Sequence, residues 1–119
     1  MVKNIYNLLM IWLLLSFMSA QPAWAHTALK SSNIEHGSVL SDAPDHLEIV
    51  FGSAVGLVGI VLKDGGDQAI DLAYEKPKSM QKSFSITLPT LEAGKYTFYW
   101  RTVAKDGHVM KGEIAFTVT

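Results

Sequence analysis

The sequence predicts an all-β domain, built as a small antiparallel sandwich or Greek-key barrel with about seven short strands. Two observations carry this prediction. β-Branched and aromatic residues alternate with polar ones at a period of two, and the spacing typical of an amphipathic helix is scarce. Clusters of glycine, proline and aspartate separate the alternating runs, as turns separate strands.

Three strands are expected in the first half of the domain, at residues 27–32, 46–51 and 57–63. In the second of these, Leu47, Ile49 and Phe51 fall on one face, which predicts that this face lies in the core. A glycine-containing break separates the second strand from the third. The stretch from Glu35 to Pro44 contains turn-forming residues, so we expect an exposed loop there.

Four more strands are expected after the Gly65-Gly66 turn, at residues 69–74, 83–88, 95–103 and 113–119. The run 95–103 places Tyr96, Phe98 and Trp100 on one side, and the other long runs alternate in the same way. A loop is predicted at residues 75–81. A polar connection, "AKDGHVMKG", joins the last two strands.

The first 25 residues are typical of a secretory signal peptide. A single cation, Lys3, precedes the apolar run "LLMIWLLLSFM", which is shorter than the roughly 20 residues of a membrane span. The triplet Ala23-Trp24-Ala25 matches the small-residue pattern of a cleavage site. We therefore expect residues 1–25 to be removed, leaving residues 26–119 as one exported, periplasmic domain. The alternative is an uncleaved anchor helix.

Composition narrows the functional classes. Without Lys3, nine basic residues stand against eleven acidic ones, so the mature chain has a formal charge of about −2. This balance does not favour binding to nucleic acid or to anionic lipid. The sequence has no cysteine, which excludes thiol chemistry and disulfides, and no motif typical of a serine nucleophile or a phosphate-binding loop.

The most informative polar motif is "DGH", Asp106-Gly107-His108, in the connection before the last strand. Residues i and i+2 of an extended or tightly turned backbone project to the same side, so Asp106 and His108 can face one point in space. A carboxylate and an imidazole are both metal ligands. Alone, the motif is also explained as an Asp-Gly turn followed by a solvated histidine.

His26 adds a second source of ligands. Cleavage after Ala25 would give this residue a free amine beside its imidazole, and the two nitrogens can close a chelate ring on one cation. If the first strand brings His26 to the edge that carries Asp106 and His108, the donors are three nitrogens and one oxygen. This set suits Cu(II) and differs from the sulfur ligands that Cu(I) prefers.

The chain resembles the CopC family of periplasmic copper-binding proteins, including its YobA-like members. The resemblance rests on the histidine before "ALKSS", on "DAPDHLEIVF", and above all on "LEAGKYTFYWRTVAKDGHVMKGEIAFTV". It implies a seven-stranded fold of immunoglobulin- or cupredoxin-like topology. It also implies one Cu(II) site made by His26, Asp106 and His108, a role in copper resistance or homeostasis, and association with a CopD-like membrane copper transporter.

Some residues depart from the family pattern or have simpler explanations. Met80 and Met110 are the only methionines after residue 25 and are far apart in sequence, so a methionine site for Cu(I) is not expected. Met110 is either core filling or a neighbour of the metal site. His36 and His46 are expected to be surface histidines. The segment "FGSAVG" lacks the acidic residue that many members carry there. Trp100 is expected in the core and Arg101 at the rim.

Three functions are compatible with these residues. The favoured hypothesis is a non-enzymatic Cu(II) binder that sequesters copper or delivers it to a membrane partner. An amine with two imidazoles is also the copper arrangement of oxidative polysaccharide monooxygenases, so a copper-dependent enzyme is the second. The third is a metal-free immunoglobulin-like interaction module in which "DGH" is only a turn.

Overall fold

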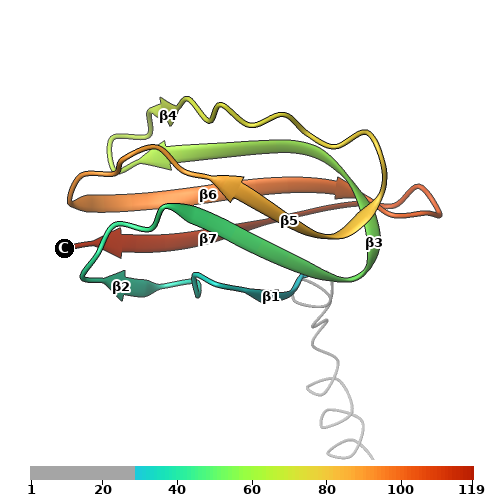
Figure 1. Ribbon diagram of the computed structural model, residues 1–119, viewed down its shortest axis with the longest axis horizontal. Helices are drawn as coiled ribbons and strands as arrows, with labels where there is room; N and C mark the ends of the chain where they lie inside the picture. Colours follow the sequence, from blue (N-terminus) through green and yellow to red (C-terminus); the bar gives the residue numbers. More distant parts are fainter. Residues whose placement is uncertain (1–28) are drawn as a thin grey trace, which may run out of the picture.

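The computed structural model describes residues 29–119 (Figure 1). The predicted signal peptide, the cleavage site and His26 lie outside these residues. Seven strands make up the regular structure of the described part. They are β1 (Leu29–Ser32), β2 (Ser38–Leu40), β3 (His46–Asp64), β4 (Ala69–Ile70), β5 (Gln81–Thr87), β6 (Gly94–Val103) and β7 (Val109–Val118). Within it, no helix is long and apolar enough to cross a membrane.

The long strand β3 connects two layers of the fold. Its first part pairs with β1 and β5, and its second part pairs with β6 and β4. Strands β7 and β2 continue the second layer beyond β6. The chain bends between the two parts, near residues 51–56, where the pairing of β3 with β5 shifts register (Figure 1). The all-β prediction is therefore confirmed, and the sheet curls into a half-barrel.

Two predicted strands, residues 46–51 and 57–63, are one continuous strand in the structure. The glycine-containing segment between them is part of this strand, so the predicted connection is wrong. Glycine also permits the strong local bend by which one strand serves two layers. The predicted strand at 69–74 is likewise shorter than expected, because only Ala69 and Ile70 pair with β3.

Strand β2 is a second correction, because it lies inside the predicted loop from Glu35 to Pro44. It pairs with β7 in parallel, so the sheet is mixed and not wholly antiparallel. Gly37 N–H donates a hydrogen bond to Ala115 O at 2.6 Å and begins this contact. The backbone of β7 thus holds a segment whose own side chains give little strand pattern, with Val39 67% exposed.

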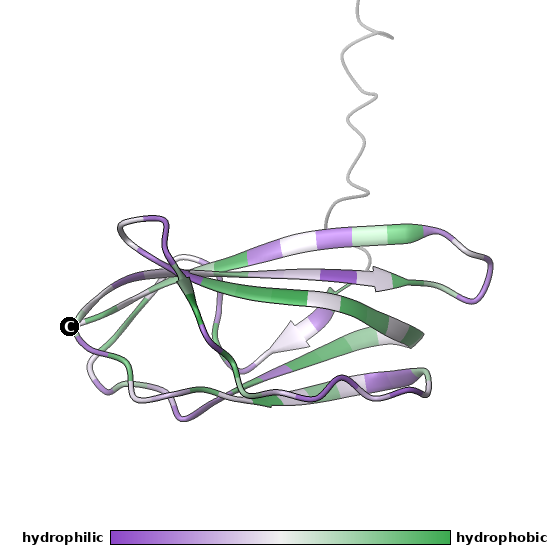
Figure 2. Ribbon diagram, turned by 90° about the horizontal axis from the view of Figure 1, so that it is seen from above, coloured by the Kyte–Doolittle hydropathy of each residue, from purple (hydrophilic) through white to green (hydrophobic). Residues whose placement is uncertain are grey.

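The core lies between the two layers. The predicted inward faces are buried, and Figure 2 shows hydrophobic and hydrophilic residues alternating along the strands. Phe51 contacts the rings of Trp100 and Phe84 edge to face, at centroid distances of 5.1 and 6.0 Å. Burial of each large apolar side chain contributes about 1.5–3 kcal/mol. This core fixes the bend and the strand ends around it.

Candidate metal centre

The candidate centre lies on the tight connection between β6 and β7. Val103 pairs with Val109 and closes the hairpin. Ala104 N–H donates to His108 O at 2.8 Å, and Gly107 N–H donates to Ala104 O at 3.0 Å. Gly107 has a φ of 91°, a conformation that glycine adopts without the strain of a Cβ atom. The glycine therefore lets the loop turn sharply between the two candidate ligands.

Asp106 and His108 are brought together, as their i, i+2 spacing predicts. His108 Nδ1 lies 2.6 Å from Asp106 Oδ2. The backbone N–H of His108 also donates to Asp106 Oδ1 at 3.1 Å. Both side chains face solvent, with 78% of the imidazole and 63% of the carboxylate side chain exposed. The pair is thus oriented by the loop and accessible to a metal ion.

The hydrogen bond determines which donor atoms remain free. It lowers the pKa of Asp106 below its ordinary value of 3.8, because the His108 side chain and then its backbone N–H stabilise the carboxylate. An ionised carboxylate only accepts hydrogen bonds, so in neutral His108 the proton is on Nδ1 and the lone pair is on Nε2. Each carboxylate oxygen retains a further lone pair. The pair therefore fits a cation that takes imidazole nitrogen and carboxylate oxygen.

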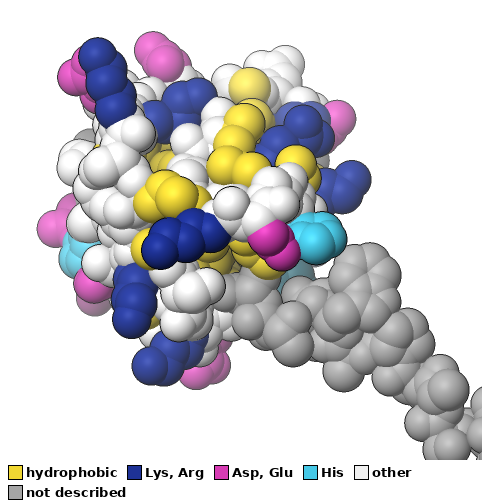
Figure 3. Space-filling view, turned by 90° about the vertical axis from the view of Figure 1, so that its right-hand side faces the viewer, with side chains coloured by type: hydrophobic (Ala, Val, Ile, Leu, Met, Phe, Trp, Pro, Cys, Tyr) yellow, Lys and Arg dark blue, Asp and Glu magenta, His cyan; other side chains and the backbone are white. Residues whose placement is uncertain are grey.

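The first described strand begins at the same end of the molecule as this loop. Leu29 pairs with Phe51 and Ser32 with Ile49, so the N-terminal end of β1 faces the bend of β3. Val103, the last residue of β6, pairs with Gly56 on the other side of the bend. Figure 3 views this end, where a histidine and acidic side chains stand among hydrophobic and basic ones. His26 itself lies outside the described residues.

The other two histidines of the described part lie elsewhere. His36 is exposed, as predicted, but its Nδ1 accepts a hydrogen bond from Ala115 N–H at 3.0 Å. His46 is exposed and lies 2.6 Å from Asp45 Oδ1 through its Nδ1. No local pattern in the sequence indicates the His36 contact, because its partner is 79 residues away. Among residues 29–119, no three His, Cys, Asp or Glu side chains are grouped to hold a metal.

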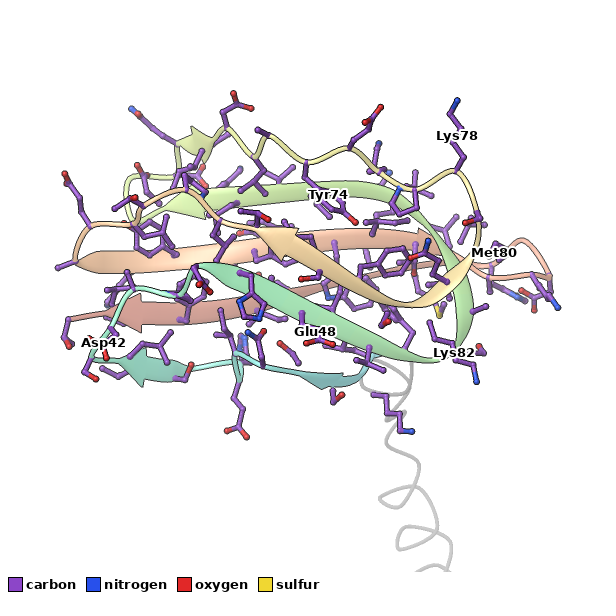
Figure 4. The ribbon with its side chains drawn as sticks, in the orientation of Figure 1. Asp42, Glu48, Tyr74, Lys78, Met80 and Lys82 are labelled. Carbon is purple, nitrogen blue, oxygen red and sulfur yellow. The ribbon has the colours of Figure 1, made fainter. Side chains whose placement is uncertain are left out.

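The structure also describes the two methionines, Trp100 and Arg101. Met110 is partly buried against the core and pairs with Thr102, which agrees with a core-filling methionine. Met80 is 38% exposed and lies at the bend, just before β5 (Figure 4). Trp100 is buried and Arg101 is exposed, as expected. Of the three predicted ligands, the described residues therefore bring Asp106 and His108 together.

Comparison with known proteins agrees with this fold. The CopC domain family matches residues 29–119. The fold is similar to the crystal structure of CopC from Methylosinus trichosporium OB3b, with 21% identity, a TM-score of 0.66, and coverage of 78% of this chain and 93% of that chain. At this identity the likeness concerns the fold alone.

Two crystal structures from Escherichia coli are also similar. Selenomethionine PcoC, a copper resistance protein, has 28% identity and a TM-score of 0.59 over 76% of this chain and 98% of that chain. A second structure, of PcoC as a methionine-rich copper resistance protein, has 29% identity and a TM-score of 0.60. It covers 79% of this chain and 99% of that chain. No curated protein sequence matches the chain. Because the family match spans most of the chain, the protein belongs to the CopC family.

Proposed function

We propose that the protein is a periplasmic Cu(II)-binding protein of copper resistance or homeostasis. The observation that carries this proposal is the exposed Asp106–His108 pair, joined at 2.6 Å, on a hairpin at the same end as the start of β1. Membership of the CopC family and similarity to E. coli PcoC, a copper resistance protein, support copper as the cargo.

His26 is proposed to complete the site after cleavage behind Ala25. It precedes Leu29 by three residues, so the chain between them spans at most about 10 Å. The proposed donors are the terminal amine and imidazole of His26, the imidazole of His108 and a carboxylate oxygen of Asp106. Such a nitrogen-rich set with one oxygen favours a tetragonal Cu(II) ion, and one ion per chain is expected.

The carboxylate in this donor set favours a copper binder over a copper enzyme. A charged carboxylate stabilises Cu(II) and opposes its reduction, which favours storage or delivery without redox turnover. We therefore propose that the protein is not an enzyme and that it sequesters copper or passes it to a membrane copper transporter. The amine and two imidazoles nevertheless match an oxidative copper site. Sustained ascorbate-driven oxygen consumption by the copper form would favour the enzyme.

The N-terminal amine provides the sharpest test of the site. The mass of the exported protein establishes whether it begins at His26. Its Cu(II) affinity, measured by competition with a chromophoric chelator, is compared with that of a protein carrying Ser-Pro-Gly-Pro before His26, because a single added residue would form a new amine–amide–imidazole chelate. We expect the extension to weaken binding by more than about 100-fold, beyond the 10–100-fold effect of indirect partners, because the amine becomes an amide. Equal affinities would refute the chelate.

A further inference from the structure

The outer face of the second layer carries a groove that the proposed copper site does not use. It crosses β3, β6 and β7, has a volume of about 660 Å³, and is lined by residues 58–61, 99–101 and 111–113. Its β7 wall begins at Lys111, three residues beyond His108. The groove therefore lies beside the loop that presents Asp106 and His108.

The walls of the groove are unusually apolar for a solvent-facing sheet surface. Val58, Val61 and Tyr99 line it and are 46, 41 and 38% exposed. Val109, which is 63% exposed, lies on β7 two residues before Lys111. These four are most of the large hydrophobic side chains exposed in the described part of the chain. Exposed apolar side chains that gather in one groove, as Val58, Val61 and Tyr99 do, mark an interaction site more often than scattered ones do.

A glycine and a bulge produce the hollow. The pairing of β3 with β6 shifts register between Leu57 and Gly59, which leaves Val58 as the extra residue. Gly59 pairs with Arg101, and a Cβ atom placed on Gly59 would meet nothing within 4 Å. The absence of a side chain at this position therefore leaves space in front of Arg101.

Two cations lie side by side next to this hollow, on β6 and β7. Arg101 pairs with Lys111 on the neighbouring strand, an arrangement of like charges that costs stability. Among the described residues, no ion pair is formed by either cation. Glu113 is the one acidic residue in the lining, and it pairs with Tyr99. The groove thus combines excess positive charge with apolar walls.

We propose that this groove docks an extended protein segment that carries a carboxylate side chain between apolar ones. The Arg101 guanidinium can bind a carboxylate through two hydrogen bonds, with Lys111 as a second positive charge, while the valines and Tyr99 contact the flanking apolar groups. An anionic membrane is a poorer match, because electrostatic lipid binding typically uses about 4–8 clustered cations and the groove presents two. A role of the docked segment in copper transfer rests on the proposed function; the docking does not.

Amide NMR tests the docking directly. The exported, ¹⁵N-labelled protein is titrated with the blocked peptide acetyl-Val-Thr-Glu-Thr-Val-amide, which places Val, Glu and Val on one face of an extended chain, and with the same peptide carrying glutamine in place of glutamate. We expect saturable shifts at Gly59, Arg101 and Lys111 with the glutamate peptide. The affinity derived from these shifts should fall as salt screens the charges. It should be at least tenfold lower for the glutamine peptide.

Variants localise the effect. Arg101→Gln combined with Lys111→Gln should weaken peptide binding at least tenfold, whereas Lys95→Gln, an exposed cation on the same strand, should not change it. Gly59→Val fills the hollow and should also weaken binding. Unchanged Cu(II) affinity in each variant confirms an intact loop. If the parent protein binds the peptide but not copper, the proposed function is contradicted and the docking proposal is not.

Three results would overturn the docking proposal. They are the absence of saturable shifts with the glutamate peptide, equal shifts with the glutamine peptide, and equal binding by the Arg101→Gln, Lys111→Gln variant. Phosphatidylglycerol vesicles form the other arm of the experiment. Shifts at the same amides with these vesicles, together with none from the peptide, would assign the groove to a membrane surface.

Discussion

Two aspartate–histidine pairs in this molecule share the same local chemistry and differ in position. His46 Nδ1 lies 2.6 Å from Asp45 Oδ1, and His108 Nδ1 lies 2.6 Å from Asp106 Oδ2. In each pair the histidine hydrogen bond is the main cause of a lowered carboxyl pKa. Hydrogen-bond geometry alone therefore does not distinguish the proposed metal-binding pair from an ordinary surface pair.

Position relative to β1 distinguishes them. The N-terminal end of β1 faces the bend of β3, where the Asp106–His108 loop lies. His46 pairs with Thr87 at the start of β3, five residues before Phe51 and thus about 17 Å along the strand. Only the loop pair lies at the end from which additional N-terminal donors would approach. In the proposed site, N-terminal donors would therefore distinguish the Asp106–His108 pair from the Asp45–His46 pair.

Removing each histidine gives the largest expected difference between the pairs. His108→Ala deletes a proposed ligand and should weaken Cu(II) binding by more than about 100-fold, since even indirect partners contribute 10–100-fold. His46→Ala should leave the affinity unchanged. Chelator competition with the two purified variants measures both. A similar loss in the two variants would contradict the assignment of the site to the loop.

Changing the carboxylates should give a smaller difference. Asp106→Asn keeps the size of the side chain but removes its charge, so we expect roughly 10–100-fold weaker Cu(II) binding. Asp45→Asn is the matched control and should bind copper as the parent does. The measurement is the same competition assay. Full affinity in Asp106→Asn would show that the carboxylate is neither a ligand nor a necessary orienting group.

Substitution of Gly107 should affect the Asp106–His108 pair and not the Asp45–His46 pair. Its φ of 91° lies in a region that costs a residue with a Cβ about 1–2 kcal/mol. Gly107→Ala should therefore lower the free energy of unfolding by about that amount and weaken copper binding by moving Asp106 relative to His108. Urea unfolding followed by a copper titration tests this. Unchanged stability would mean that the turn is not held in this conformation.

The pH dependence is the smallest effect and has a defined sign. Because the folded pKa of Asp106 is lowered, its hydrogen bond stabilises the loop above the ordinary carboxyl pKa and is lost as pH falls through the lowered value. Carboxyl NMR should show the Asp106 pKa rising in His108→Ala and the Asp45 pKa rising in His46→Ala. Copper itself should leave earlier, near pH 5, because protons displace it from imidazole and amine.

Much of the fold was predictable because alternation is a local property. The faces that contain Leu47, Phe84 and Phe98 are buried as the period-two pattern requires. Strand β2 was not predictable, because three residues with an exposed Val39 are held by the backbone of β7. The continuity of β3 was also hidden, since glycines in a sequence indicate a turn and a bent strand equally well.

The candidate site likewise has features that the sequence predicts and features that it does not. The approach of Asp106 to His108 follows from their spacing and from Gly107, so it could be predicted. The location of the loop at the same end of the molecule as the start of β1 depends on how β1 and β6 pair with β3, which no local pattern contains. The groove beside the loop depends on cross-strand register, which brings Arg101 opposite Lys111.

Electron paramagnetic resonance of the processed protein tests the central claim most directly. Cu(II) is added in steps to a sample whose mass shows His26 as the first residue. One tetragonal, nitrogen-rich signal that saturates at one equivalent, and that is lost in His108→Ala but kept in His46→Ala, is the expected result. A signal that fails to saturate at one equivalent, or that persists in His108→Ala, would contradict a Cu(II) site at the β6–β7 loop.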